Sequence, residues 1–389
     1  MTKHSLVASS LAMVALSFAG GREVAARAAD PDCADPAQDQ RSEGQRLFDD
    51  ESFGGNGRTC LTCHSRETGT LSAADAARRF AEDPDDALFA FDGSDDGAGN
   101  GVSRILADAT ILVEIPLPAN VTLADDPSAR SVILRRGIPS TLNTPALDPV
   151  LMLDGRAPTL QAQAADAIAG HAQASLIPTS DQLTAIADFQ KTDDFFTSSA
   201  LRNFARGGDA PGLPYGHTES ERRGRRFFED LPGTTGDLKD GLCAACHSGP
   251  MLNQTNEFLP VPVPVGTRFF SVRVSDFNVA RNPLRDFIFT QPDGSTIVLS
   301  SPDPGRALIT GVAQGPDQRN AFKIPSLRGV ARTAPYFHDN SAATLEQLTV
   351  HYTRFFDAVS DPDAGGPLEP AIHLTPQDQA DMVAFMKLL

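Results

Sequence analysis

Cys60-Leu61-Thr62-Cys63-His64 and Cys243-Ala244-Ala245-Cys246-His247 decide how this chain folds, because both have the spacing C-x-x-C-H. Two thiols at this spacing can form thioethers with the two vinyl groups of a haem, and the next residue can place an imidazole on the iron. A zinc site would bring its two cysteine pairs together, but roughly 180 residues separate these pairs. A thioredoxin-like redox pair would not need histidine directly after it, twice. The two motifs therefore predict two covalently attached haem c groups.

Similar segments precede the two motifs. Arg46-Leu47-Phe48 lies before the first and Gly224-Arg225-Arg226-Phe227-Phe228-Glu229 before the second, and both predict an amphipathic helix leading into a haem loop. Glu43-Gly44-Gln45 and Arg222-Arg223-Gly224 stand in parallel positions. We expect a mainly α fold of two cytochrome-c-like domains, over 29–210 and 211–389, with one haem each. The Gly- and Pro-rich stretch 206–214 is the predicted linker.

Apolar periodicity between the motifs predicts mostly helix. The predicted helices cover 73–82, 160–174, 180–190, 220–229, 344–356 and 376–387. Runs of β-branched or aromatic residues predict small β-hairpin insertions, over 110–117 with 131–135, and over 269–274, 287–289 and 297–299. The stretch 92–101 predicts a flexible acidic loop that lacks the terminal glutamate of a calcium loop.

The first 28 residues have the pattern of a secretory signal peptide. Lys3 and His4 precede an apolar run over 6–19, and Ala26-Arg27-Ala28 fits a cleavage site. A membrane anchor is the alternative, but a spanning helix needs about 20 apolar residues. We therefore expect the mature protein to work in the periplasm. Cys33 has no predicted role.

Composition limits the class of protein and its partners. The chain has 389 residues, of which 41% are hydrophobic, and a formal net charge of −17. This hydrophobic content predicts a globular protein rather than a disordered one. The negative charge argues against nucleic acid or an anionic membrane surface as a partner and permits a basic protein partner.

Further motifs extend the pattern over nearly all of the chain after the signal sequence. They are Arg136-Gly137-Ile138-Pro139, Asp154-Gly155-Arg156-Ala157, Phe322-Lys323-Ile324-Pro325-Ser326-Leu327-Arg328, Thr333-Ala334-Pro335-Tyr336-Phe337-His338-Asp339 and Thr344-Leu345-Glu346. With the two C-x-x-C-H motifs, they resemble the bacterial di-haem cytochrome c peroxidase superfamily, which includes the MauG-like enzymes. The resemblance implies that hydrogen peroxide forms high-valent iron at the first haem and that a partner protein or small molecule is oxidised. It makes His64 and His247 the proximal ligands and the second haem the electron relay.

The resemblance places the sixth ligand of the second haem at Tyr352, within the predicted helix 344–356. The alternative is a core tyrosine on the apolar stripe of that helix, and His351 is the second choice of ligand. An anionic phenolate stabilises high-valent iron better than the thioether of methionine, as in catalase. Tyr352 therefore favours MauG-like oxidative chemistry over peroxide scavenging.

The resemblance assigns the catalytic residues opposite His64 to the helix after Asp154-Gly155-Arg156. Gln163 falls at a family glutamine, and Gln173 falls where the family has its catalytic glutamate. An amide is no general base at neutral pH, so we expect His171 to replace that glutamate. His171 packing at a helix end, or binding the first haem iron itself, are the alternatives. No histidine lies between His64 and His171, which favours an open first haem.

Leu153 stands where the family usually has a tryptophan between the haems, and the chain contains no tryptophan. Tyr336 is either a substitute relay or a packed aromatic residue. Arg156 and Arg328 are expected to pair with haem propionates or with carboxylates.

A calcium site between the haems would use Thr333 and Pro335. Its usual asparagine is Gly137 here, which weakens the expectation of Ca²⁺.

Three other functions fit parts of the pattern. A scavenging cytochrome c peroxidase would take electrons from small redox proteins, a non-catalytic di-haem cytochrome would only transfer electrons, and an oxygenase would use dioxygen.

Overall fold

The computed structural model describes residues 41–143, 145–230, 237–361 and 371–389. Ser42–Leu389 form one compact unit, and the division at residue 210 remains a prediction. The predicted signal sequence over 1–28 and Cys33 lie outside the described residues. Among the described helices, none combines the length and apolar character needed to cross a membrane.

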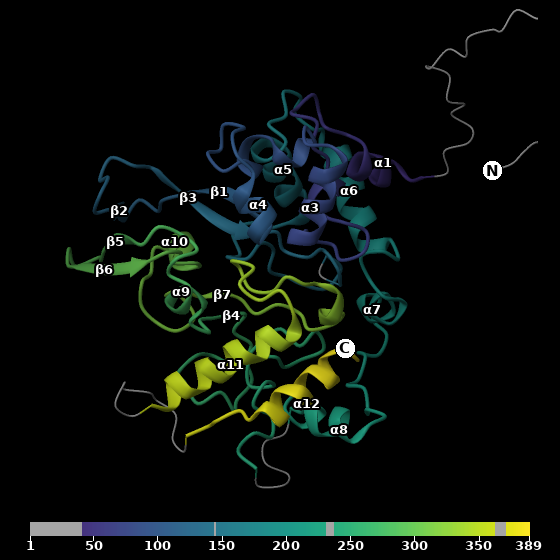
Figure 1. Cartoon of the computed structure of the whole chain (residues 1–389), viewed down its shortest axis with the longest axis vertical. Helices are drawn as coiled ribbons and strands as arrows, with labels where there is room; N and C mark the ends of the chain where they lie inside the picture. Colours follow the sequence, from purple (N-terminus) through teal and green to yellow (C-terminus); the bar gives the residue numbers. More distant parts are fainter. Residues whose placement is uncertain (1–40, 144, 231–236, 362–370) are drawn as a thin grey trace, which may run out of the picture. The chain divides into compact units, whose positions relative to one another are not determined.

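Helix is the larger share of a mixed helix and strand fold (Figure 1). The helices are α1 Glu43–Asp49, α2 Cys60–Cys63, α3 Ala73–Glu82, α4 Ser103–Asp108, α5 Leu160–Gly170, α6 Ser180–Thr192, α7 Ser199–Ala205, α8 Glu219–Arg226, α9 Val274–Phe277, α10 Ala307–Thr310, α11 Leu345–Ser360 and α12 Pro376–Met386, with 3₁₀ turns η1 Ala87–Phe89, η2 Phe91–Gly93 and η3 Val330–Arg332. All six predicted helices are confirmed to within a few residues. Their boundaries follow from capping: Thr179, Thr218 and Thr375 each accept a backbone hydrogen bond at a helix start.

The strands are β1 Thr110–Pro116, β2 Val121–Leu123, β3 Ser131–Gly137, β4 Phe269–Phe270, β5 Arg285–Thr290, β6 Thr296–Ser301 and β7 Phe322–Lys323. The predicted pairing of β1 with β3 and of β5 with β6 is confirmed, and both pairs are antiparallel. β2 adds to the second pair, with Val121 opposite Phe289. The predicted strand 269–274 is shorter, because Val274 begins α9, and its predicted association with 287–289 is wrong, because β4 pairs with β7. The β-structure therefore joins segments from both halves of the sequence.

Each C-x-x-C-H motif follows the first helix of an equivalent pair, whose second helix comes later in the chain. α1 packs against α6, and α8 packs against α12 (Figure 1). A glycine stands at each contact. A Cβ on Gly44 would collide with the carbonyl oxygen of Ala185, and a Cβ on Gly224 would collide with that of Asp381. The structure thus gives a physical reason for the parallel glycines, since only glycine lets the two backbones approach this closely.

Aromatic contacts repeat in the two helix pairs. The ring centroids of Phe48 and Phe189 lie 5.7 Å apart, and those of Phe228 and Phe385 lie 5.3 Å apart. Phe48 follows Gly44 by four residues, and Phe228 follows Gly224 by four. Each pair belongs to its own hydrophobic core cluster. The chain therefore contains the same helix pair twice, and each C-x-x-C-H motif lies between the two helices of its pair in the sequence.

We predict that Gly224→Ala destabilises the protein by about 2–3 kcal/mol, because the added methyl group overpacks the contact between α8 and α12. Gly170→Ala is the matched control, since a Cβ on this helical glycine meets nothing within 4 Å. Urea unfolding followed by circular dichroism measures both changes. Equal stability of Gly224→Ala and the wild-type protein would contradict this account of the contact.

Candidate active site

The first C-x-x-C-H motif has the geometry that haem attachment requires. Cys60 and Cys63 stand at the ends of the one-turn helix α2, and His64 ends it with its N–H bonded to the Cys60 carbonyl at 3.0 Å. His64 Nδ1 lies 2.8 Å from the Gly69 carbonyl oxygen. A carbonyl oxygen can only accept a hydrogen bond, so Nδ1 carries the proton and donates, and Nε2 is left as the ligand atom.

The second motif repeats this arrangement. The His247 N–H bonds to the Cys243 carbonyl at 2.8 Å, and His247 Nδ1 lies 2.9 Å from the Leu252 carbonyl oxygen. In both motifs the accepting carbonyl belongs to the fifth residue after the histidine. Burial lowers the pKa of His64 and lowers that of His247 to about 4. Both imidazoles are therefore neutral at pH 7, as an iron ligand must be.

The four cysteines are suited to thioether formation and not to redox exchange. None of them forms a disulfide within the described residues. Burial raises the pKa of all four thiols, to about 12 for Cys60 and for Cys246. Redox-active cysteines instead have a lowered pKa, because the thiolate is the reactive form. The described residues also contain no cluster of three or more His, Cys, Asp or Glu side chains that could hold a metal ion.

A cavity of about 150 Å³ adjoins the first motif, where the sequence predicts the peroxide-reactive haem. His64 and His171 both line it, and so do Gln163 and Arg156. The neighbouring His171 also lowers the pKa of His64, after the larger effect of burial. The structure thus brings together His64, Gln163 and His171, which the sequence placed around the first haem.

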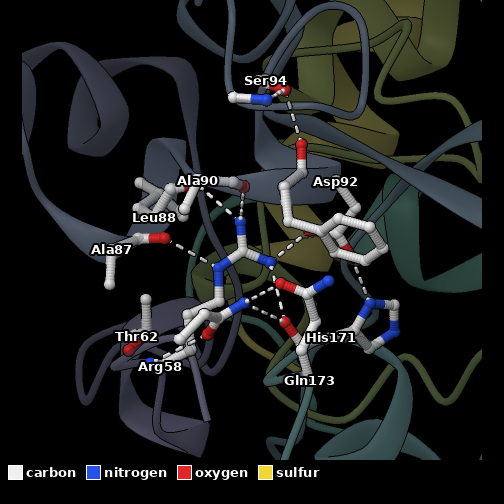
Figure 2. A network of polar contacts seen from close by, with 12 residues as sticks. Arg58, Thr62, Ala87, Leu88, Ala90, Asp92, Ser94, His171 and Gln173 are labelled. Carbon is white, nitrogen blue, oxygen red and sulfur yellow. Dashed lines mark hydrogen bonds and ion pairs between the residues drawn. The ribbon is translucent and has the colours of Figure 1, made fainter.

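His171 is held by a buried ionic network that the sequence did not predict (Figure 2). Its Nδ1 lies 2.5 Å from Asp92 Oδ2, and the other carboxylate oxygen of Asp92 pairs with Arg58 Nη1. Asp92 lies in η2 and is buried, although the sequence placed it at the start of a flexible acidic loop. Arg58 precedes Cys60 by two residues. No spacing rule links these three residues, so sequence reasoning missed Arg58 and Asp92.

Gln173 does not join this site. It is exposed, outside the lining of the cavity, and its Oε1 accepts a hydrogen bond of 3.3 Å from Asn56 Nδ2. The reason is local, because α5 ends at Gly170 and Gln173 has a positive φ of 50°. The predicted extension of this helix to residue 174 is wrong by four residues. His171, at the helix end, is the nearer replacement for the family glutamate.

A larger cavity of about 1040 Å³ adjoins the second motif. Cys243, Cys246 and His247 line it together with Tyr352 of α11. Burial, followed by the nearby thiols of Cys246 and Cys243, raises the pKa of Tyr352 above its usual range. The free phenol is therefore protonated, and iron would have to displace that proton to bind it.

His351 makes its contacts outside the larger cavity that Tyr352 lines. Its Nε2 lies 2.8 Å from the Val272 carbonyl oxygen, and its ring packs against Phe277 and Phe337. It is not among the residues lining the larger cavity. This geometry favours Tyr352 over His351 as the residue that faces the second haem.

Arg156 and Arg328 have different roles. Arg156 Nη1 donates to both oxygens of Asp154, each at 2.9 Å, as a salt-bridge partner would. Arg328 donates to the backbone carbonyls of Pro211, Gly212 and Pro250. It therefore ties the predicted linker to the loop that follows His247. It has no carboxylate partner among the described residues, and its pairing with a haem propionate stays a prediction.

Arg136 forms buried ion pairs with two carboxylates, those of Asp154 and Asp303. It is 1% exposed, donates to Asp154 Oδ2 at 2.5 Å and makes two bonds, of 2.7 and 2.8 Å, to Asp303. The two carboxylates raise the pKa of Arg136 against the opposing effect of burial. This network joins β3 to the Asp-Gly-Arg motif and to the turn after β6. Removing one carboxylate would leave a buried charge unpaired, which is strongly destabilising.

A thin wall separates the two cavities. Six residues line both of them: Gly137, Ile138, Pro139, Ser140, Leu153 and Lys323. Leu153, at the family tryptophan position, thus lies between the two sites. Tyr336 lines only the larger cavity, where its hydroxyl donates to the Val330 carbonyl at 3.0 Å.

The residues proposed for calcium do not make a convincing cation site. Thr333, Pro335 and Gly137 line the same large cavity. The Thr333 hydroxyl donates to the Val330 carbonyl at 3.1 Å, and no carboxylate cluster of three or more groups occurs among the described residues. Calcium prefers six to eight oxygen ligands with several carboxylates. The donor set therefore does not fit, and Ca²⁺ has no part in the function proposed below.

Comparison with known proteins identifies relatives of this chain. No family model matches it. Cytochrome c551 peroxidase of Nitrosomonas europaea is 51% identical over 47 residues, 12% of this chain and 13% of that protein. Cytochrome-c peroxidase IdrP1 of Denitromonas iodatirespirans is 24% identical over 212 residues, 52% of this chain and 51% of that protein. The chain thus matches about half, or less, of the length of these curated relatives.

Solved structures also resemble the chain. A MauG-like protein associated with microbial copper homeostasis has 22% identity and a TM-score of 0.48, with 89% of this chain and 86% of that chain covered. The diheme peroxidase BthA from Burkholderia thailandensis has 16% identity and a TM-score of 0.42, with 88% and 84% covered.

The curated relatives agree with the resemblance drawn from the motifs. This chain is similar to bacterial cytochrome-c peroxidases over about half of its length or less. The two C-x-x-C-H motifs predict haem c. The residues around them fit that group, because two thiols and one neutral imidazole line each cavity.

Proposed function

We propose that this chain is an exported, periplasmic di-haem c-type peroxidase of the MauG-like type, which uses hydrogen peroxide to oxidise a partner protein or small molecule. Cys60, Cys63 and His64 would hold the peroxide-reactive haem, and Cys243, Cys246 and His247 the electron-relaying one. One observation carries the proposal. His171 lines the same cavity as His64, with Nδ1 bonded to a buried carboxylate and Nε2 left available.

The haem iron supplies the site that binds peroxide and holds its oxidising equivalents. His171 Nε2 accepts a proton from one peroxide oxygen and delivers it to the other, which leaves as water. Over the whole cycle, one hydrogen peroxide takes up two protons and two electrons and gives two water molecules. The two electrons come from the oxidised partner. Gln163, in the same cavity, can donate a hydrogen bond to the bound peroxide.

Charge supports a protein as the electron donor or substrate. The chain carries a net charge of −17, which would steer a basic protein towards it and repel an acidic one. The Gly137–Ser140 stretch, Leu153 and Lys323 line both cavities. Electrons from a partner docked near the second haem would cross this thin wall to the first.

We predict one high-spin and one low-spin haem in the ferric protein, by electron paramagnetic resonance, because Tyr352 would bind the second haem as its sixth ligand while the first haem would keep an open position. Micromolar peroxide should then change the Soret spectrum. Two low-spin haems would contradict the open first site. A Soret spectrum that peroxide leaves unchanged would instead indicate an electron-transfer cytochrome.

Replacement of the proposed sixth ligand gives a second test. Tyr352→Phe keeps the aromatic ring and removes the oxygen, so the low-spin signal of the second haem should disappear. Tyr336→Phe is the matched control, because that hydroxyl bonds to a backbone carbonyl in the same cavity and should leave the signal unchanged. A low-spin signal that survives in Tyr352→Phe would exclude the phenol as the ligand.

A further inference from the structure

His171 belongs to a hydrogen-bond and ion-pair network that reaches beyond the cavity it lines. Both oxygens of the Asp92 carboxylate are engaged, one by His171 Nδ1 and the other by Arg58 Nη1. The Asp92 side chain is 6% exposed and that of Arg58 is 2% exposed. A carboxylate buried this deeply needs a compensating charge, which Arg58 supplies.

Arg58 is itself fixed on several sides. Its guanidinium donates to the carbonyl oxygens of Ala87 and Leu88, both at 2.8 Å, and of Ala90 at 2.5 Å (Figure 2). Arg58 Nη1 also lies 3.3 Å from the His171 carbonyl oxygen. The planar guanidinium can make these contacts in one orientation only, so Asp92 is presented to the imidazole by a rigid group.

Three segments that are distant in sequence meet at this network. They are the residues directly before Cys60, the turns η1 and η2, and the end of α5. Asn56 strengthens the junction, since its N–H bonds to the Ala172 carbonyl at 2.8 Å and its Nδ2 to the His171 carbonyl at 3.0 Å. The position of His171 is therefore set by the loop that enters the first attachment motif.

We infer that Asp92 is a positioning residue which, held by Arg58, fixes the tautomer and orientation of His171 so that its Nε2 is the proton acceptor in the first cavity. A carboxylate accepts only, so Nδ1 must carry the proton and the neutral ring has its lone pair on Nε2. Asp92 is not among the residues that line the first cavity. The inference rests on the proposed function, in which His171 moves the peroxide proton.

Asp92→Asn tests this inference sharply because Arg58 has only donors. The amide oxygen must then face Arg58, and the amide N–H₂ must face His171. Nδ1 is forced to accept, the ring proton moves to Nε2, and the proton acceptor of the cavity is lost. The substitution nearly preserves volume, so it changes the tautomer more than the packing.

The probe is hydrogen cyanide, a neutral acid that must lose its proton to bind ferric haem and that requires no turnover. Stopped-flow association of cyanide and the rate of reaction with peroxide are measured on the full-length di-haem protein at equal haem content. Both rates should fall by about 10²–10⁴-fold in Asp92→Asn and in His171→Ala. In a His171→Ala background, Asp92→Asn should have no further effect beyond about twofold.

Asp85→Asn is the matched control, since it makes the same charge change at an exposed residue close to η1. Asp92→Ser is the second variant in case Asp92→Asn does not assemble, because four backbone carbonyls still surround Arg58 without the carboxylate. Wild-type cyanide association in both Asp92 variants would overturn the inference. If cyanide association falls as expected but peroxide does not react with the wild-type protein, the proposed function is wrong and the positioning role of Asp92 stands.

Discussion

The close contact between two pairs of helices is the constraint on which both sites depend. Gly44 lets α1 lie against the backbone of α6, and Gly224 lets α8 lie against that of α12. The phenylalanine one turn later then packs against its partner helix in each pair. Each C-x-x-C-H motif follows the first helix of such a pair, so the helix contact fixes where the two thiols and the imidazole enter their cavity.

The side chains around the two motifs differ, although equivalent helix pairs support both. Arg58, Arg136 and Arg156 line the first cavity, each of them in an ion pair, together with His171. The second cavity is larger and is lined by aromatic residues around Tyr352 as well as by charged ones such as Glu229 and Arg273. An available imidazole suits proton transfer, whereas a phenol suits a haem with a sixth ligand. The same local fold thus supports two different proposed roles.

Much of the fold could be predicted from local sequence signals. Helix starts at Thr179 and Thr375 were predictable because a capping side chain and the apolar periodicity agree there. Strands β1 and β3 were predictable from their β-branched runs. The pairing of β2 with β5 was not, because strand partners 164 or more residues apart leave no local signal.

The candidate site was predictable only where a motif marks it. The cysteines and proximal histidines follow from C-x-x-C-H, and His171 followed from its titration range. Asp92 could not be found, because it stands beside other acidic residues in a Gly-rich stretch and its burial depends on Arg58, 34 positions earlier. Gln173 was placed by counting along a helix that ends three residues before it. Where a helix ends, and which distant residues form an ion pair, depend on the folded chain and cannot be read from a local stretch of sequence.

Covalent attachment of haem at both motifs is the central claim, and intact mass spectrometry of the exported protein tests it most directly. The account predicts a coloured protein whose mass equals the processed chain plus two haem groups, and plus one when Cys243 and Cys246 are both replaced by alanine. A colourless protein, or a wild-type mass with a single haem, would contradict it.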